Sequence, residues 1–125
     1  MALKKVLTIA GSDTSAGAGM QADLKTFQEL DTYGMVALTA IVTMDKDTWS
    51  HDVTPLPMDV FEKQLETALS IGPDAIKTGM LGTEEIIKRA GEVYEASNAQ
   101  YFVVDPVMVC KGCLLYTSLS GLARQ

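Results

Sequence analysis

Short, nearly continuous runs of apolar residues predict four strands along the chain. Residues 4–10 and 35–44 are rich in Val, Ile, Leu and Thr, which is typical of strands covered on both faces. Residues 74–80 predict a third strand, and residues 101–109 predict a fourth that is interrupted by Pro106. All four runs are short enough to be strands of one buried sheet.

Between these runs the apolar residues recur at helical spacing. A first helix is expected to begin near Met20 and to end near Gly34, and a second follows Phe61 and ends at Gly72. Thr83 precedes two glutamates, so it is expected to be the N-cap of a third helix. The sequence therefore predicts three helices, one between each pair of strands.

Strands that alternate with helices indicate an α/β fold with a doubly wound, mostly parallel sheet and helices on both faces. The polar segment 45–57 contains two prolines and is expected to be a loop. In such folds ligands bind beyond the carboxyl ends of the strands. Those ends are expected at Gly11–Asp13, Met44–Asp45, Gly79–Met80 and Asp105–Pro106.

Composition and charge exclude several partners. The chain has 125 residues, 47% of them hydrophobic, which fits a single folded domain. Its net charge is −6 and its basic residues form no stripe, so we expect no nucleic-acid partner. No apolar run approaches the roughly 20 residues that span a bilayer, and the short run after MALKK is better explained as a first buried strand than as a signal peptide. We expect a cytoplasmic protein without a membrane partner.

Cys110 and Cys113 form a lone C-x-x-C pair. A zinc site needs a second pair of ligands, and the only histidine, His51, is far away in the sequence. The residues around the pair also differ from those of a thioredoxin-like redox site. The favoured interpretation is two unrelated cysteines, without metal or redox chemistry.

The stretch AGSDTSAGAGMQADLK, residues 10–25, joins a strand to a helix through a glycine-rich loop. It lacks the lysine of a Walker phosphate loop, and Ala22 stands where a dinucleotide fold would have its third glycine. Asp23 is expected in the first helical turn, where a carboxylate is favourable for structural reasons alone. The residues by themselves leave open what this loop binds.

Three blocks together are more specific. GSDTSAGAGMQADLKTFQELDTYG, TGMLG and VVDPVMVCKG closely resemble, in the same order, blocks of the phosphomethylpyrimidine kinases and their pyridoxine and pyridoxal kinase relatives, which belong to the ribokinase-like superfamily. The resemblance covers residues 4–112. It implies ATP-dependent phosphorylation of the hydroxymethyl group of pyridoxal, pyridoxine or hydroxymethylpyrimidine, with Mg²⁺ as cofactor, in vitamin B6 salvage or thiamine biosynthesis.

The resemblance also implies roles for single residues. Gly11 would let the backbone approach the substrate ring, and the Asp23 carboxylate would accept hydrogen bonds from ring substituents. Met80 and Val107 would form apolar walls of the ring pocket, although ordinary core positions explain them about equally well. Asp105 would lie near the Mg²⁺ and phosphates of ATP, unless it only stabilises the Asp-Pro turn. The glycine loop would then cover a heteroaromatic alcohol rather than a phosphate.

Two further residues bear on the substrate. His51 could stack on a pyridine ring, although a lone loop histidine is usually only solvated. Met44 stands where the pyrimidine-specific kinases commonly have a glutamine, and a thioether cannot replace the two hydrogen bonds of an amide. This favours pyridoxal or pyridoxine, with hydroxymethylpyrimidine also possible.

The resemblance stops near Gly112. We expect residues 1–112 to be the amino-terminal half of a ribokinase-like kinase domain, truncated after the fourth predicted strand. Residues 113–125, which contain no acid and one base, are expected to be foreign. The family has its catalytic group in the missing half, so no catalytic residue is expected in this chain, which should be nearly inactive. The intact parent is expected to be a homodimer.

Two other functions stay open on the sequence alone. One is a non-catalytic α/β module that binds a small ligand through Gly11, Asp23 and Met80. The other is a dinucleotide-binding domain, which the failed glycine spacing disfavours. Binding of a ring alcohol without ATP turnover would distinguish the first of these from a kinase.

Overall fold

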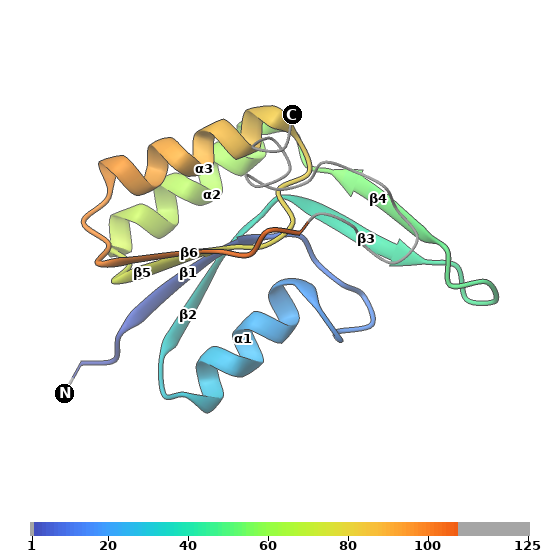
Figure 1. Ribbon diagram of the computed structural model, residues 1–125, viewed down its shortest axis with the longest axis horizontal. Helices are drawn as coiled ribbons and strands as arrows, with labels where there is room; N and C mark the ends of the chain where they lie inside the picture. Colours follow the sequence, from blue (N-terminus) through green and yellow to red (C-terminus); the bar gives the residue numbers. More distant parts are fainter. Residues whose placement is uncertain (1, 108–125) are drawn as a thin grey trace.

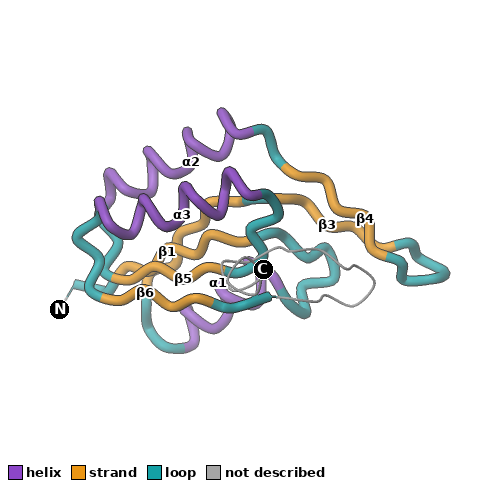
Figure 2. Tube along the Cα trace, turned by 45° about the horizontal axis from the view of Figure 1, so that its top comes forward, coloured by secondary structure: helices purple, strands orange, loops and turns teal. Residues whose placement is uncertain are grey.

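The computed structural model describes residues 2–107 and shows an open parallel sheet between helices (Figure 1). Four parallel strands lie in the order β2-β1-β5-β6. Helix α1 covers one face, and α2 and α3 lie side by side on the other (Figures 1 and 2). The elements are β1 (Lys5–Ala10), α1 (Gly19–Glu29), β2 (Tyr33–Leu38), β3 (Ala40–Met44), β4 (His51–Pro55), α2 (Met58–Ile71), β5 (Ala75–Thr78), α3 (Glu84–Ala96) and β6 (Tyr101–Val104). The α/β class, the mostly parallel sheet and the helices on both faces are confirmed.

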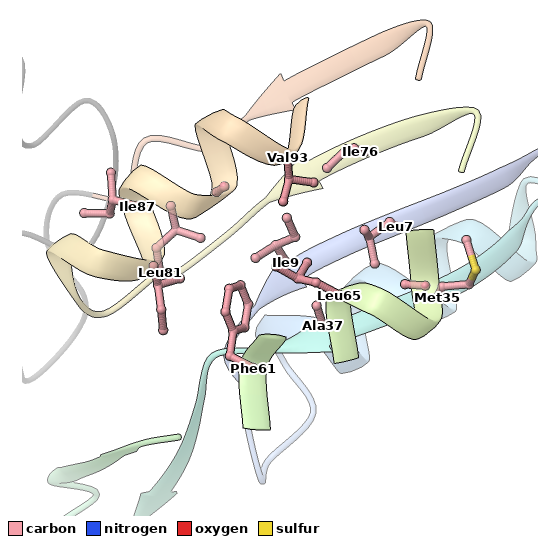
Figure 3. Close-up of a cluster of buried hydrophobic side chains, with 13 residues drawn as sticks. Leu7, Ile9, Met35, Ala37, Phe61, Leu65, Ile76, Leu81, Ile87 and Val93 are labelled. Atoms are coloured by element: carbon pink, nitrogen blue, oxygen red, sulfur yellow. The ribbon is translucent and has the colours of Figure 1, made fainter. Parts of the chain in front are cut away.

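The core lies between the sheet and the α2–α3 layer (Figure 3). Leu7 and Ile9 of β1 are fully buried there against Phe61 and Leu65 of α2. The other face has a different character, because α1 has no fully buried residue and Thr8 of β1 points toward it. Most of the hydrophobic burial in this fold is therefore on the α2–α3 side.

The prediction of one strand over residues 35–44 was wrong. The chain bends at Thr39, whose N–H donates to the Ala10 carbonyl at 3.0 Å and whose Oγ1 donates to the Met80 carbonyl at 2.7 Å. These bonds end β2 inside the main sheet and turn β3 out of it. The bend satisfies the polar groups of Thr39, which is fully buried.

The segment 45–57, predicted as a loop, contains strand β4. It pairs antiparallel with β3 to form a two-stranded hairpin that projects from the main sheet (Figure 1). The sequence of β4, HDVTP, is short and half polar, and much of the hairpin is exposed, so no apolar run marks it. The helix boundaries also differ slightly, because α1 ends at Glu29 and Tyr33 already belongs to β2.

The N-cap prediction for α3 is confirmed. Thr83 Oγ1 accepts from the Ile86 N–H at 3.2 Å, and two glutamates occupy the first turn. Helix α2 ends at Gly72 in the left-handed conformation, as predicted. Within residues 2–107, no helix is both long and apolar enough to cross a membrane.

Candidate functional site

A cavity of about 200 Å³ lies at the carboxyl ends of the strands, where the fold predicts a ligand site. The loop after β1, the hairpin β3–β4, the end of β5 and the segment after β6 all contribute to its wall, which is mostly apolar. These segments are far apart in the sequence, and the parallel sheet brings them together. The predicted site residues that line this cavity are Gly11, Met44, His51, Met80, Asp105 and Val107.

Asp23 is the predicted site residue that the structure does not bring to the cavity wall. Its carboxylate accepts from Lys77 Nζ at 2.8 and 2.9 Å and from Thr8 Oγ1 at 2.6 Å. It also lies in the second turn of α1, so the expectation of a first-turn position was wrong. Both carboxylate oxygens are engaged beneath the cavity, at the α1 face of the sheet.

The glycine loop is organised by Asp13, which the sequence did not single out as a site residue. One carboxylate oxygen accepts from the Ser15 N–H at 2.9 Å and from Ser15 Oγ at 2.7 Å, and the other accepts from the Ala18 N–H at 2.8 Å. Ala18 is the N-cap of α1. A carboxylate from the loop itself thus uses an amide that a phosphate-binding loop would offer to its ligand.

The same contacts set the ionisation of Asp13. Burial raises the pKa of its carboxyl, but the hydrogen bonds from Ser15, Ala18 and the Gly17 amide outweigh this and hold the pKa below its ordinary value of 3.8. The side chain is therefore a carboxylate at neutral pH. It fixes the loop as an acceptor and has little remaining capacity to bind a ligand.

The glycine at position 19 allows the loop to close. It has φ +63°, and a Cβ there would lie 2.7 Å from the Gly11 carbonyl oxygen and 3.0 Å from the Asp13 nitrogen. The Met20 N–H donates to that same Gly11 carbonyl at 2.9 Å. The start of α1 therefore packs directly onto the end of β1.

The hairpin forms the opposite wall of the cavity. Met44 and His51 face each other across β3 and β4, and Val42 and Val53 form the next pair on the same face of this ladder. The His51 Nδ1 atom is buried and has no hydrogen-bond partner among the described residues. The wall therefore combines aliphatic and thioether surface with an aromatic ring that keeps one polar atom unused.

The ends of β1, β5 and β6 also contribute to the cavity wall. A Cβ on Gly11 would lie 2.8 Å from Met80 Cε, so the backbone and the thioether are in close contact. Asp105 follows β6, and its N–H donates to the Thr78 carbonyl at 3.1 Å. Its side chain is exposed, and no hydrogen bond to the carboxylate is found within the described part of the chain. This carboxylate is available to a ligand at the mouth of the cavity.

Sequence reasoning missed Lys77 as well as Asp13. Lys77 lines the cavity and lies in the middle of β5, in the apolar context DAIKTGM. A charged residue inside an otherwise buried strand was the available indication, because such a group needs a partner. Residues 2–107 contain no group of three or more His, Cys, Asp or Glu side chains that could hold a metal. The C-x-x-C pair lies outside the described residues.

Comparison with known proteins identifies the family. The phosphomethylpyrimidine kinase family matches residues 13–117.

The chain belongs to the phosphomethylpyrimidine kinase family.

Its fold is the ribokinase-like α/β fold of these kinases, and the chain is 54% identical to the pyridoxine kinase of Bacillus subtilis over 129 aligned positions, covering 100% of this chain and 48% of that protein. It is 45% identical to the hydroxymethylpyrimidine/phosphomethylpyrimidine kinase of the same organism, covering 90% of this chain and 41% of that protein.

A solved structure agrees with these sequence matches. The structure of the pyridoxal kinase from Staphylococcus aureus in complex with AMP-PCP and pyridoxal is 98% identical, with a TM-score of 0.87. The match covers 89% of this chain and 41% of that chain. The chain thus spans less than half the length of these kinases.

Proposed function

We propose that the cavity binds the ring of a heteroaromatic alcohol, and that the chain carries the ring-binding part of an ATP-dependent kinase of vitamin B6 or of the thiamine pyrimidine. The observation that carries this proposal is the convergence of Gly11, Met44, His51 and Met80 on one mostly apolar cavity. A concave, mostly apolar site with a few polar groups suits a small aromatic ligand.

The described residues can bind and orient such a ring. Met80 and Val107 offer apolar surface, and the aromatic side chain of His51 offers a face for stacking. Gly11 has no side chain, so the backbone of the loop can lie close to the ring. Burial of these apolar surfaces against the ring would favour binding. The exclusion of water would also shield the hydroxymethyl group from bulk solvent.

Asp105 is the residue here that suits the nucleotide side of the reaction. Its exposed carboxylate is a hard oxygen ligand, which fits a direct or water-mediated contact with Mg²⁺. Mg-ATP, when bound, supplies the phosphoryl group that the hydroxymethyl oxygen of the ring receives. The role of the described residues is to hold the alcohol in place at the mouth where Asp105 lies.

Met44 favours the B6 vitamers as substrates. A thioether at the end of β3 offers apolar contact and cannot donate and accept as an amide does, so an aminopyrimidine gains less from this wall than a pyridine does. The sequence identity to the pyridoxine kinase of Bacillus subtilis is 54%, which exceeds the 45% identity to the hydroxymethylpyrimidine/phosphomethylpyrimidine kinase of the same organism. Pyridoxal and pyridoxine are therefore the preferred ligands in this proposal.

The chain by itself is proposed to bind without catalysing. Phosphoryl transfer needs a base for the alcohol and donors around the γ-phosphate. The described residues near the cavity offer carboxylates, one imidazole and one lysine, of which Asp13 and Lys77 are already engaged in hydrogen bonds. We place the catalytic group in the part of these kinases that the match does not cover.

Two measurements test this function. Calorimetric titration of the folded chain with pyridoxine should give saturable heat, with weaker binding of hydroxymethylpyrimidine, and a coupled assay should find no pyridoxine-dependent ATP turnover. A folded chain that binds neither ring would overturn the binding proposal. Turnover that depends on pyridoxine would overturn the separation of binding from catalysis.

A further inference from the structure

Lys77 is a charged residue on the less apolar face of the sheet. Along β5, Ile76 and Thr78 are fully buried on the α2–α3 side, and Lys77 points the other way, toward α1. Thr8 of the neighbouring strand β1 is its register partner. Thr8 and Lys77 therefore place two polar side chains side by side on the α1 face of the sheet, next to the cavity.

Asp23 of α1 fixes the position of the Lys77 ammonium. Two N–H groups of Nζ donate to the two carboxylate oxygens at 2.8 and 2.9 Å, and the side chains of Lys77 and Asp23 are only 22% and 16% exposed. Burying such a pair costs desolvation that hydrophobic residues of the same size would avoid. Stability alone therefore does not account for the pair, which leaves room for another role.

The geometry places the ammonium at the cavity. A Cβ on Gly79 would lie 3.3 Å from Lys77 Nζ and 2.9 Å from Ala10 Cβ, and both Gly79 and Ala10 line the cavity with Lys77. An ammonium has three N–H donors, and Asp23 accepts two of them. Among the described residues that line the cavity, Lys77 is the sole lysine or arginine.

We propose that Lys77 is a ring-binding residue that donates its third N–H to the ring hydroxyl oxygen of a 3-hydroxypyridine, and that Asp23 positions it. This inference rests on the proposed function. Because the Lys77–Asp23 pair is neutral as a whole, it offers an oriented donor rather than a net charge. The ring oxygen of a 3-hydroxypyridine suits this donor, because in neutral water the ring nitrogen takes up much of its proton. Asp23 then acts on the ligand through Lys77 and not by direct contact.

Three variants separate ligand binding from structural support. Lys77→Met removes the donor and should weaken pyridoxine binding about 10-fold or more, as expected for a charge-assisted hydrogen bond. Asp23→Asn keeps the ammonium and should weaken binding only a few-fold. The double variant Asp23→Asn with Lys77→Met removes both charges, so it should unfold at a higher denaturant concentration than Lys77→Met alone and still bind poorly. Pyridoxine is the probe because pyridoxal would form imines with surface lysines.

A change in the ligand provides the decisive comparison. Replacing the ring hydroxyl of pyridoxine by hydrogen should weaken binding to the unmodified chain about 10-fold and should leave binding to Lys77→Met nearly unchanged. Equal weakening in both chains, or no weakening in the unmodified chain, would overturn the inference, even if the variants were unstable. Wild-type affinity in the double variant would also overturn it and would leave the proposed function intact. A folded, unmodified chain that binds no pyridoxine would overturn both.

Discussion

Met44 on β3 lies directly opposite His51 on β4, and both side chains line the cavity. The two residues are held by one antiparallel ladder that projects from the main sheet. The loop after β1 is attached to this ladder, since the Ser12 N–H donates to the Ala40 carbonyl at 2.9 Å. The hairpin and the glycine loop therefore form one continuous wall of the cavity.

Met44→Gln should shift the preference of the cavity toward the pyrimidine. The amide can donate and accept, so hydroxymethylpyrimidine gains a hydrogen bond of about 0.5–1.5 kcal/mol, which is roughly 2- to 12-fold in affinity. Competitive titration of pyridoxine and hydroxymethylpyrimidine measures the ratio. Met44→Leu, which keeps the apolar volume, is the control and should leave the ratio unchanged. A ratio that moves equally in both variants would show that wall packing, not the amide, decides the preference.

Gly19→Ala should disrupt the loop, because the new Cβ meets backbone atoms at 2.7 and 3.0 Å and φ is +63°. We expect the free energy of unfolding to fall by about 1–3 kcal/mol and pyridoxine binding to weaken. Gly91→Ala is the matched control, since a Cβ on this α3 residue meets nothing within 4 Å. It should raise stability by about 0.5–1 kcal/mol. Urea unfolding measures the change in unfolding free energy for both variants. An equal change in the two would contradict this explanation.

Asp13→Asn should destabilise the loop at neutral pH by about 1–3 kcal/mol. The new amide NH₂ group would face one of the N–H groups that now donate to the Asp13 carboxylate. The pKa of Asp13 is lower in the folded chain than its ordinary 3.8. The contribution of Asp13 to the free energy of unfolding is therefore fully present above pH 3.8 and is lost as the pH falls through the lower pKa of the folded chain.

Unfolding of the wild type and of Asp13→Asn between pH 7 and pH 3 checks this dependence. The difference in unfolding free energy should stay constant down to about pH 5 and shrink at the acid end. A difference that grows on acidification would show that the carboxylate is not the stabilising form.

Tyr101→Lys should reduce self-association of the chain. Tyr101 on the edge strand β6 is 61% exposed and lies on the face of the sheet that carries α1. Such an apolar edge favours pairing with another chain. Tyr33→Lys is the matched control on the opposite edge strand, β2, where the side chain is 52% exposed. Sedimentation of the three proteins at equal concentration measures the association. An equal reduction by both changes would refute a specific role for β6.

Local patterns predicted most of the sheet and helices. The alternation of strands with helices indicated the parallel order, and Thr83 marked the start of α3. The hairpin could not be predicted in this way, because the bend at Thr39 depends on bonds to Ala10 and Met80 that come from distant parts of the chain. Strand β4 has a single partner and little burial, so its sequence carries no continuous apolar run.

The candidate site followed from topology more than from single residues. Parallel strands end at one edge, and this rule placed Gly11, Met80 and Asp105 together. Met44 lines the same cavity, but from the hairpin, which lies outside the parallel sheet. The position of Asp23 could not be predicted, because its partner Lys77 lies 54 residues away in the sequence. The role of Asp13 in organising the glycine loop became apparent only once its hydrogen-bond partners were known.

Expectations for the end of the chain stay predictions. Residues 113–125 and the two cysteines lie outside the described residues. The family match extends to residue 117, and the alignment with the Bacillus subtilis pyridoxine kinase covers the whole chain. Peptide mass mapping of the native protein would establish whether the sequence after Gly112 is genuine.

The central claim is that the cavity at the strand ends binds the ring, and the most direct test is an NMR titration of the isotope-labelled chain with pyridoxine. The account predicts saturable shifts of the backbone amides of Gly11, Ser12, His51 and Met80, with none in the separate groove beside α2 at Val60 and Lys63. Shifts confined to the α2 groove, or no shifts in a folded chain, would contradict it.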